Sequence, residues 1–108
     1  MKRKKYTPVV CGDGFRMSVQ ASNMNYSVPK DNVGPYSEVE VGHPSEYDMY
    51  LAPYAEDPGR PTETVYGYVP AHVVQMVIDA RGGIVEGELP PLRFDPSASS
   101  VFNRNEFI

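Results

Sequence analysis

The sequence has few of the side chains that ligate metals or act as nucleophiles. Among its 108 residues there is one cysteine, Cys11, and there are two histidines, His43 and His72, which form no motif. One cysteine cannot form an internal disulfide, and a zinc site needs three or four suitably spaced ligands. We therefore expect no metal, no cofactor and no catalytic residue. A nucleophilic pair of Cys11 with either histidine stays a distant alternative.

Long hydrophobic runs are also missing. No apolar stretch approaches the roughly 20 residues that a transmembrane helix needs. The basic start passes directly into YTPVV, without the apolar segment of a signal peptide. We therefore expect no membrane association. Tryptophan is absent too, whereas tyrosine occurs eight times, and the hydrophobic fraction of 41% is typical of a globular domain.

Basic residues are scarce in the middle of the chain. Residues 33–90 contain ten acids and two bases, a balance of −8. Such a surface repels nucleic acid and favours a partner protein with a basic surface, although a solubilising role is the simpler interpretation. Four bases open the chain: Lys2, Arg3, Lys4 and Lys5. They could make weak phosphate contacts, but a solvated terminus is the simpler interpretation, and we expect no other nucleic-acid binding.

Two segments alternate between apolar and polar residues with a period of two, which indicates half-buried strands. They are residues 15–22 and residues 36–41. A shorter β-prone run, residues 6–10, precedes the turn sequence CGDG. The first run and residues 15–22 are therefore predicted to form a hairpin.

Residues 64–83, TVYGYVPAHVVQMVIDARGG, predict a strand followed directly by a helix. In the strand, alternation places Val65 and Val69 on one face and Tyr66 and Tyr68 on the other.

The helix is predicted at about residues 70–81, with Pro70 in its first position and Gly82-Gly83 as its stop. Its apolar positions form one broad face. The opposite, polar face is predicted to hold His72, Gln75, Asp79 and Arg81.

These elements predict one α+β domain over residues 6–90. A small antiparallel sheet of about four strands would be covered on one face by the single helix and joined by long proline-rich loops. The sequence also allows one last short strand within residues 84–89. Ser45 and Asp48 have the spacing of a capping box, which would start a short turn. Residues 1–5 would form a basic arm and residues 91–108 an extended tail. Five apolar tail residues could dock on the body or on a partner: Phe94, Val101, Phe102, Phe107 and Ile108.

Tyrosines and acids coincide in one part of the sequence, and six of the eight tyrosines lie in the acidic span. Tyrosine is enriched in protein interfaces because it offers a large contact area at a small entropic cost. Some of these rings could instead be core residues. The predicted partner-binding residues are Tyr36, Glu38, Glu40, Glu46, Tyr47, Asp48, Tyr50, Tyr54, Glu56 and Asp57.

Five blocks of the sequence, GFRMSVQAS, SEVEVGHPS, PYAEDP, PTETVYGYVP and VVQMVIDARGG, resemble small uncharacterised proteins encoded by bacteriophages. The resemblance spans roughly residues 6–89 and rests on phrases and their order rather than on a catalytic motif. It implies a phage accessory or minor structural protein, in the host cytoplasm or in a virion.

Together these observations favour a non-enzymatic phage accessory protein that binds or inhibits a host protein, such as a defence component, through its acidic, tyrosine-rich loops. The alternative is a minor virion component that uses its basic arm or aromatic tail. A homo-oligomer through an exposed sheet edge also stays open.

Overall fold

Residues 3–94 are described by a computed structural model, whereas residues 1–2 and 95–108 lie outside the described part of the chain. Lys2 of the predicted basic arm is therefore not placed. The same holds for most of the predicted tail, including Val101, Phe102, Phe107 and Ile108.

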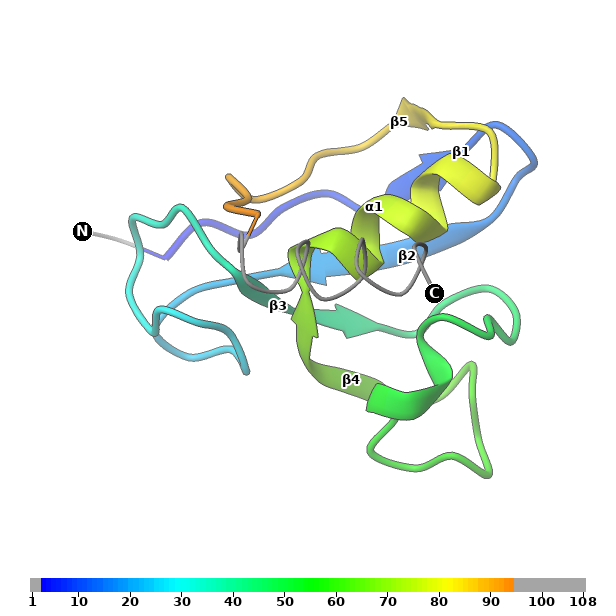
Figure 1. The fold of residues 1–108 in the computed structure, drawn as a ribbon, viewed down its shortest axis with the longest axis horizontal. Coiled ribbons are helices and arrows are strands. Elements are labelled where there is room, and N and C mark those ends of the chain that lie inside the picture. The colour runs from blue at the N-terminus through cyan, green and yellow to red at the C-terminus, as the bar shows by residue number, and fades with distance from the viewer. Residues whose placement is uncertain (1–2, 95–108) are drawn as a thin grey trace, which may run out of the picture.

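Five strands form one antiparallel sheet in the order β4-β3-β2-β1-β5 (Figure 1). The strands are β1 (Val9–Cys11), β2 (Arg16–Gln20), β3 (Glu38–Gly42), β4 (Val65–Pro70) and β5 (Ile84–Glu86). A 3₁₀ helix, η1 (Ala52–Tyr54), precedes β4, and the helix α1 (Ala71–Ala80) follows it. The α+β class and the single α-helix are confirmed for the described residues. The sheet has five strands rather than about four, because Ile84–Glu86 pairs with β1.

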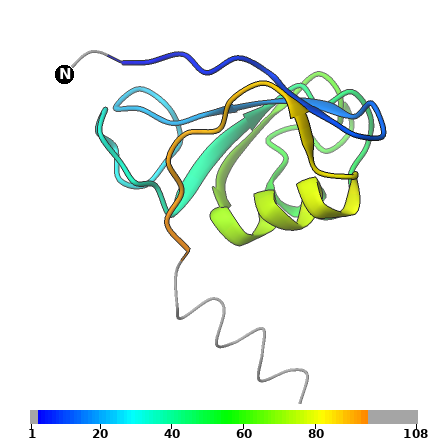
Figure 2. The same cartoon turned by 90° about the horizontal axis from the view of Figure 1, so that it is seen from above.

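The helix covers one face of the sheet (Figure 2). Residues Met17 and Val19 of β2 and Val39 and Val41 of β3 alternate inward and are buried, as the period-two pattern predicts. The helix contributes Val73, Val74, Val77 and Ile78 to the same core. Burying one such side chain stabilises a fold by about 1.5 to 3 kcal/mol. The common core therefore fixes the helix on this face.

The helix begins one residue later than predicted. Pro70 ends β4 and serves as the N-cap of α1. At the other end, Gly82 and Gly83 have positive φ angles, and the Gly83 amide donates to the Ile78 carbonyl at 2.9 Å. Among residues 3–94 no helix has both the length and the apolar character to cross a membrane.

An extra residue interrupts the alternation of β4. Tyr66 pairs with Val41 and Val69 with Val39, so three steps along β4 match two steps along β3. This is a β-bulge, and within it Tyr68 takes a left-handed backbone conformation with φ 53°. The predicted faces of this strand are therefore wrong. Tyr66 and Val69 are both buried, while Tyr68 is 42% exposed.

The two outermost strands differ in what lies beside them. Ala55 bridges to Tyr66, and the Glu56 amide donates to the Val65 carbonyl at 2.9 Å, which covers the outer side of β4. The Tyr68 amide also donates to the Tyr26 carbonyl at 3.1 Å. No strand lies beyond β5 in the described part of the chain.

Both ends of the described chain attach to the body. Lys4 forms an ion pair with Glu88 at 3.2 Å, and the Glu88 amide donates to the Thr7 carbonyl. The segment just after residue 90 runs beside Tyr36, whose amide donates to the Pro91 carbonyl and whose carbonyl accepts from the Arg93 amide. The first residues of the predicted tail are thus part of the folded body.

Candidate functional site

The predicted partner-binding residues lie in several places rather than on one surface. Glu38 and Glu40 belong to β3. Four others, residues 46–48 and Tyr50, lie near Arg81 at the end of α1. Tyr54, Glu56 and Asp57 lie at or just after η1, beside β4.

Tyr36 is a core residue and not part of a surface. Its side chain is 1% exposed, and its hydroxyl donates to the Asp31 carbonyl at 2.8 Å. Burial, with a smaller contribution from the Asp31 carboxylate, raises the pKa of the Tyr36 hydroxyl. The prediction that Tyr36 contacts a partner is therefore wrong, because its ring fills the core.

Asp48 is also buried and has a structural role. Its side chain is 4% exposed, and one carboxylate oxygen accepts from the amides of Tyr50 at 2.8 Å and Leu51 at 3.1 Å. Asp48, rather than the predicted Ser45, thereby caps the turn before η1. The Ser45 hydroxyl oxygen instead accepts from the Arg16 amide at 3.0 Å. Asp48 cannot be a direct partner contact.

Arg81 binds the acids of this region. Its guanidinium lies 2.6 Å from Glu46, 3.2 Å from Asp48 and 3.5 Å from Asp13. It also stacks 4.2 Å from the ring centroid of Phe15. The hydrogen bond to Glu46 is the main cause of the raised pKa of Arg81. Arg81, predicted on the polar face of the helix, is the C-cap residue of α1, and its side chain is only 16% exposed.

A recess of about 330 Å³ lies beside Arg81 and is lined partly by Tyr47, Met49 and Tyr50. Tyr47 and Met49 are well exposed, whereas Tyr50 packs partly against the core. The neighbouring carboxylates of Glu46 and Asp48 already face the Arg81 guanidinium. This recess therefore has little unpaired negative charge to offer a basic partner.

A second recess, of about 260 Å³, combines aromatic rings with an unpaired carboxylate, and we call it the tyrosine recess. It is lined by Tyr26, Tyr54, Glu56, Gly67 and Tyr68. These residues come from the segment between β2 and β3, from η1 and the residues after it, and from the bulge of β4. Within residues 3–94 the Glu56 carboxylate makes no hydrogen bond or ion pair.

The rings of the tyrosine recess lie close together. The Tyr26 and Tyr68 centroids are 5.8 Å apart with planes inclined by 37°. The Lys30 ammonium lies over both rings, 5.3 Å from the Tyr26 centroid and 5.6 Å from that of Tyr68. At Gly67 a Cβ atom would lie 3.3 Å from the Tyr26 side chain. The absence of a side chain at Gly67 therefore lets Tyr26 approach β4.

The remaining predicted acids have different surroundings. Glu40 accepts hydrogen bonds from the Tyr26 amide at 3.0 Å and from the Asn25 side chain at 3.3 Å, so it positions the segment that carries Tyr26. Glu38 is partly exposed on β3. Asp57 is exposed and accepts from the Gly59 amide at 3.1 Å. Only Tyr54 and Glu56 among the predicted residues line the tyrosine recess.

Neither Tyr26 nor Tyr68 is among the predicted partner-binding residues, although the sequence leaves Tyr68 equally open to a role in the sheet or in an interface. For Tyr68 a signal was present, because a glycine within a strand pattern, here Gly67, often marks a bulge. No sequence signal identifies Tyr26, which lies in an irregular segment.

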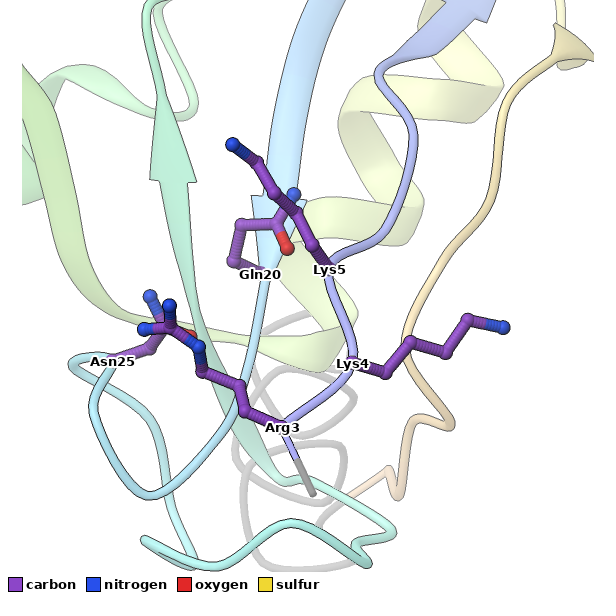
Figure 3. A pocket seen from close by; sticks show the side chains of 5 residues that line it. All are labelled: Arg3, Lys4, Lys5, Gln20 and Asn25. Carbon is purple, nitrogen blue, oxygen red and sulfur yellow. The ribbon is translucent and has the colours of Figure 1, made fainter.

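A basic recess of about 200 Å³ is lined by Arg3, Lys4, Lys5, Gln20 and Asn25 (Figure 3). Gln20 anchors the arm by accepting from the Tyr6 amide at 2.9 Å and donating to the Tyr6 carbonyl at 2.7 Å. Lys4 points away from Gln20 and Asn25 and pairs with Glu88 (Figure 3). Arg3 and Lys5 have no ion pair within the described residues.

The Cys11 thiol lies in a setting that lowers its reactivity. Cys11 is 1% exposed, and burial, with a smaller contribution from Asp13, raises its pKa. The thiolate is the reactive form of cysteine, so both effects oppose nucleophilic chemistry. No group of three or more metal-ligating side chains occurs among residues 3–94.

Comparison of the chain with protein-family models, with curated proteins and with solved structures gives no match.

Proposed function

We propose that this chain is a non-enzymatic phage accessory protein that acts by binding a host protein with a basic surface. The tyrosine recess, including the predicted contacts Tyr54 and Glu56, would be the centre of the interface. The protein would act in the host cytoplasm, for example by inhibiting a defence component.

One observation supports this proposal most directly. Glu56 carries an unpaired carboxylate beside three tyrosine rings in the described part of the chain. Complementary charge steers association and suppresses wrong partners, and exposed tyrosines supply contact area. The other acidic recess lacks this combination because Arg81 pairs with its acids.

An affinity capture from infected host lysate tests the proposal when recess variants are matched with a control. We expect the wild-type protein to retain a defined host protein, and Glu56→Lys and Tyr68→Asn to lose it. Asparagine tolerates the left-handed conformation of Tyr68, so the second variant should keep its fold. Asp48 is unsuitable for charge reversal, because its burial against Arg81 would confound binding with unfolding.

Glu86→Lys provides the control, because Glu86 is an exposed acid of β5 outside the tyrosine recess. It makes the same change in net charge as Glu56→Lys. Retention of the partner by both recess variants, or equal loss in the control, would contradict the proposal.

The alternative function is a minor virion component whose basic arm or aromatic tail contacts a neighbouring subunit or the packaged genome. The basic recess favours it, because Arg3 and Lys5, which have no ion pair within residues 3–94, could bind phosphates there. In that case the protein should occur in purified particles at a fixed stoichiometry. Deletion of residues 1–5 or 94–108 should then reduce incorporation without unfolding the protein.

A further inference from the structure

We propose that the tyrosine recess receives one arginine side chain of a partner protein. The inference rests on the proposed function, because it identifies the chemical group that the partner would insert. It goes further in assigning a single occupant to a single recess rather than general attraction between two charged surfaces.

The rings of the recess already accept a cation from this chain. Tyrosine faces carry negative electrostatic potential and attract ammonium or guanidinium groups within about 6 Å of the ring centroid. Lys30 lies within this range of both Tyr26 and Tyr68. Lys30 is not among the residues that line the recess. The Lys30 ammonium therefore does not line the recess that a second cation would enter.

The charges around the recess favour a positive occupant. Glu56 is one of the residues that line it, and the Glu56 carboxylate has no partner in the described residues. Asp57 follows directly in the chain. Glu40 holds the Tyr26 amide nearby. The recess lining includes one charged residue, Glu56, and no base, while Lys30 lies over the rings. An incoming guanidinium would thus meet a carboxylate that no base of the lining neutralises.

The size of the recess and its mixture of groups favour arginine. Its volume of about 260 Å³ is smaller than the roughly 300 to 1,000 Å³ of sites for drug-sized ligands, and suits a single side chain. A guanidinium is planar and can stack on an aromatic ring while donating two hydrogen bonds to a carboxylate. A lysine ammonium acts as a point charge and cannot do both in the same way.

The backbone of β4 is shaped to present the ring of Tyr68. A left-handed conformation is rare for a bulky residue such as tyrosine, and strained conformations of this kind gather at ligand sites. The bulge takes Tyr68 out of the alternation of β4 and places its ring beside Tyr26. Bulges elsewhere also redirect side chains next to functional sites.

A titration with blocked peptides on the full-length protein tests the inference. The probe is the tripeptide Gly-Arg-Gly with blocked ends, compared with the same peptide carrying citrulline, a neutral isostere of arginine. Two-dimensional NMR should show saturable shifts at the amides of Tyr26, Gly67 and Tyr68 with the arginine peptide. The citrulline peptide should bind at least about tenfold more weakly.

Matched variants assign the binding to the recess. Glu56→Gln and Tyr68→Asn should each weaken the arginine peptide about tenfold, whereas Glu86→Gln should leave its affinity unchanged. The dispersion of the NMR spectrum reports whether each variant is folded. Glu56→Gln keeps the size of the side chain, so it tests the charge even if Tyr68→Asn perturbs the bulge.

The outcomes separate this inference from the proposed function. Equal binding of the two peptides, absence of saturable binding, or shifts confined to other acids would overturn the arginine assignment. If the recess variants still lose the host protein in that case, the proposed function stands with a different occupant. If the arginine peptide binds the recess but both variants keep the host protein, the inference holds for the recess and the proposed interface is wrong.

Discussion

The guanidinium of Arg81 joins the end of α1 to the turn before β2 and to the segment that leads into η1. It pairs with Glu46, Asp48 and Asp13 and stacks on Phe15. Asp48 depends on this contact most, because its carboxylate is almost fully buried. Removing one member of a buried ion pair leaves the other charge without compensation.

We therefore expect Arg81→Ala to lower the free energy of unfolding by about 2 to 4 kcal/mol, as measured by urea denaturation. Arg60→Ala is the matched control. Its pair with Glu63 is exposed on both sides, and such pairs contribute less than about 1 kcal/mol. Equal effects of the two substitutions would show that Arg81 does not organise this region.

Among the contacts between elements, Glu88 links the segment after β5 to the N-terminal segment through Lys4 and Thr7. The Thr7 amide, followed by Lys4, lowers the pKa of the Glu88 carboxyl. A lowered pKa means that the folded state favours the carboxylate. The stabilisation is therefore present above the ordinary carboxyl pKa of 4.5 and is lost as the pH falls through the folded-state value.

We expect acidification below about pH 4.5 to speed the hydrogen exchange of the Glu88 amide, after correction for intrinsic rates. The Glu88→Gln variant should lack this acid dependence and exchange faster at neutral pH. An unchanged pH profile in the variant would assign the transition to another carboxyl. Asp31 is the candidate to check, because the Gly34 and Val33 amides lower its pKa as well.

The alternation of apolar and polar residues predicts a strand correctly where one face of that strand is buried in the core. Residues of β2 and β3 alternate as expected because Met17, Val19, Val39 and Val41 are all buried in the core that the helix shares. The pattern fails in β4, where strict alternation assigns Tyr66 to the wrong face. A bulge adds one residue against the partner strand, and its position depends on the pairing with β3 rather than on the periodicity of β4.

The predicted partner-binding residues were also only partly identified, because contacts between distant segments decide where each side chain lies. Composition identifies an acidic, tyrosine-rich span, and Tyr54 and Glu56 of that span do line one recess. Composition cannot tell that Tyr36 fills the core or that Arg81 binds Glu46 and Asp48, because these contacts join segments far apart in the sequence. Tyr26 approaches β4 closely at Gly67, where a Cβ atom would lie 3.3 Å from its side chain, and composition does not reveal this contact.

For the whole molecule, the segment after residue 90 completes the fold. The backbone of Tyr36 bonds to Pro91 and Arg93, and Leu92 packs against the core. We expect a chain that ends at residue 90 to melt several degrees lower than a chain that ends at residue 94, since the shorter chain exposes Tyr36 to water and lacks both backbone hydrogen-bond partners of Tyr36.

Calorimetry on the two truncated chains measures this difference. The comparison is internally controlled, because both variants lack residues 95–108 and differ only in the four residues from 91 to 94. Equal melting temperatures would mean that the contacts of residues 91–93 with Tyr36 add nothing to stability.

The unequal sides of the sheet set a limit on how copies of this chain could associate through backbone pairing. The outer side of β4 already receives Ala55 and Glu56, whereas β5 is the last strand in the described residues and exposes Ile84 and Val85. A molecule with one free strand edge can pair with one other copy through that edge, and the resulting dimer has no free edge of this kind left. Pairing of two copies along β5 would therefore give a dimer, and the contacts of Ala55 and Glu56 with Tyr66 and Val65 oppose further strand addition at the start of β4.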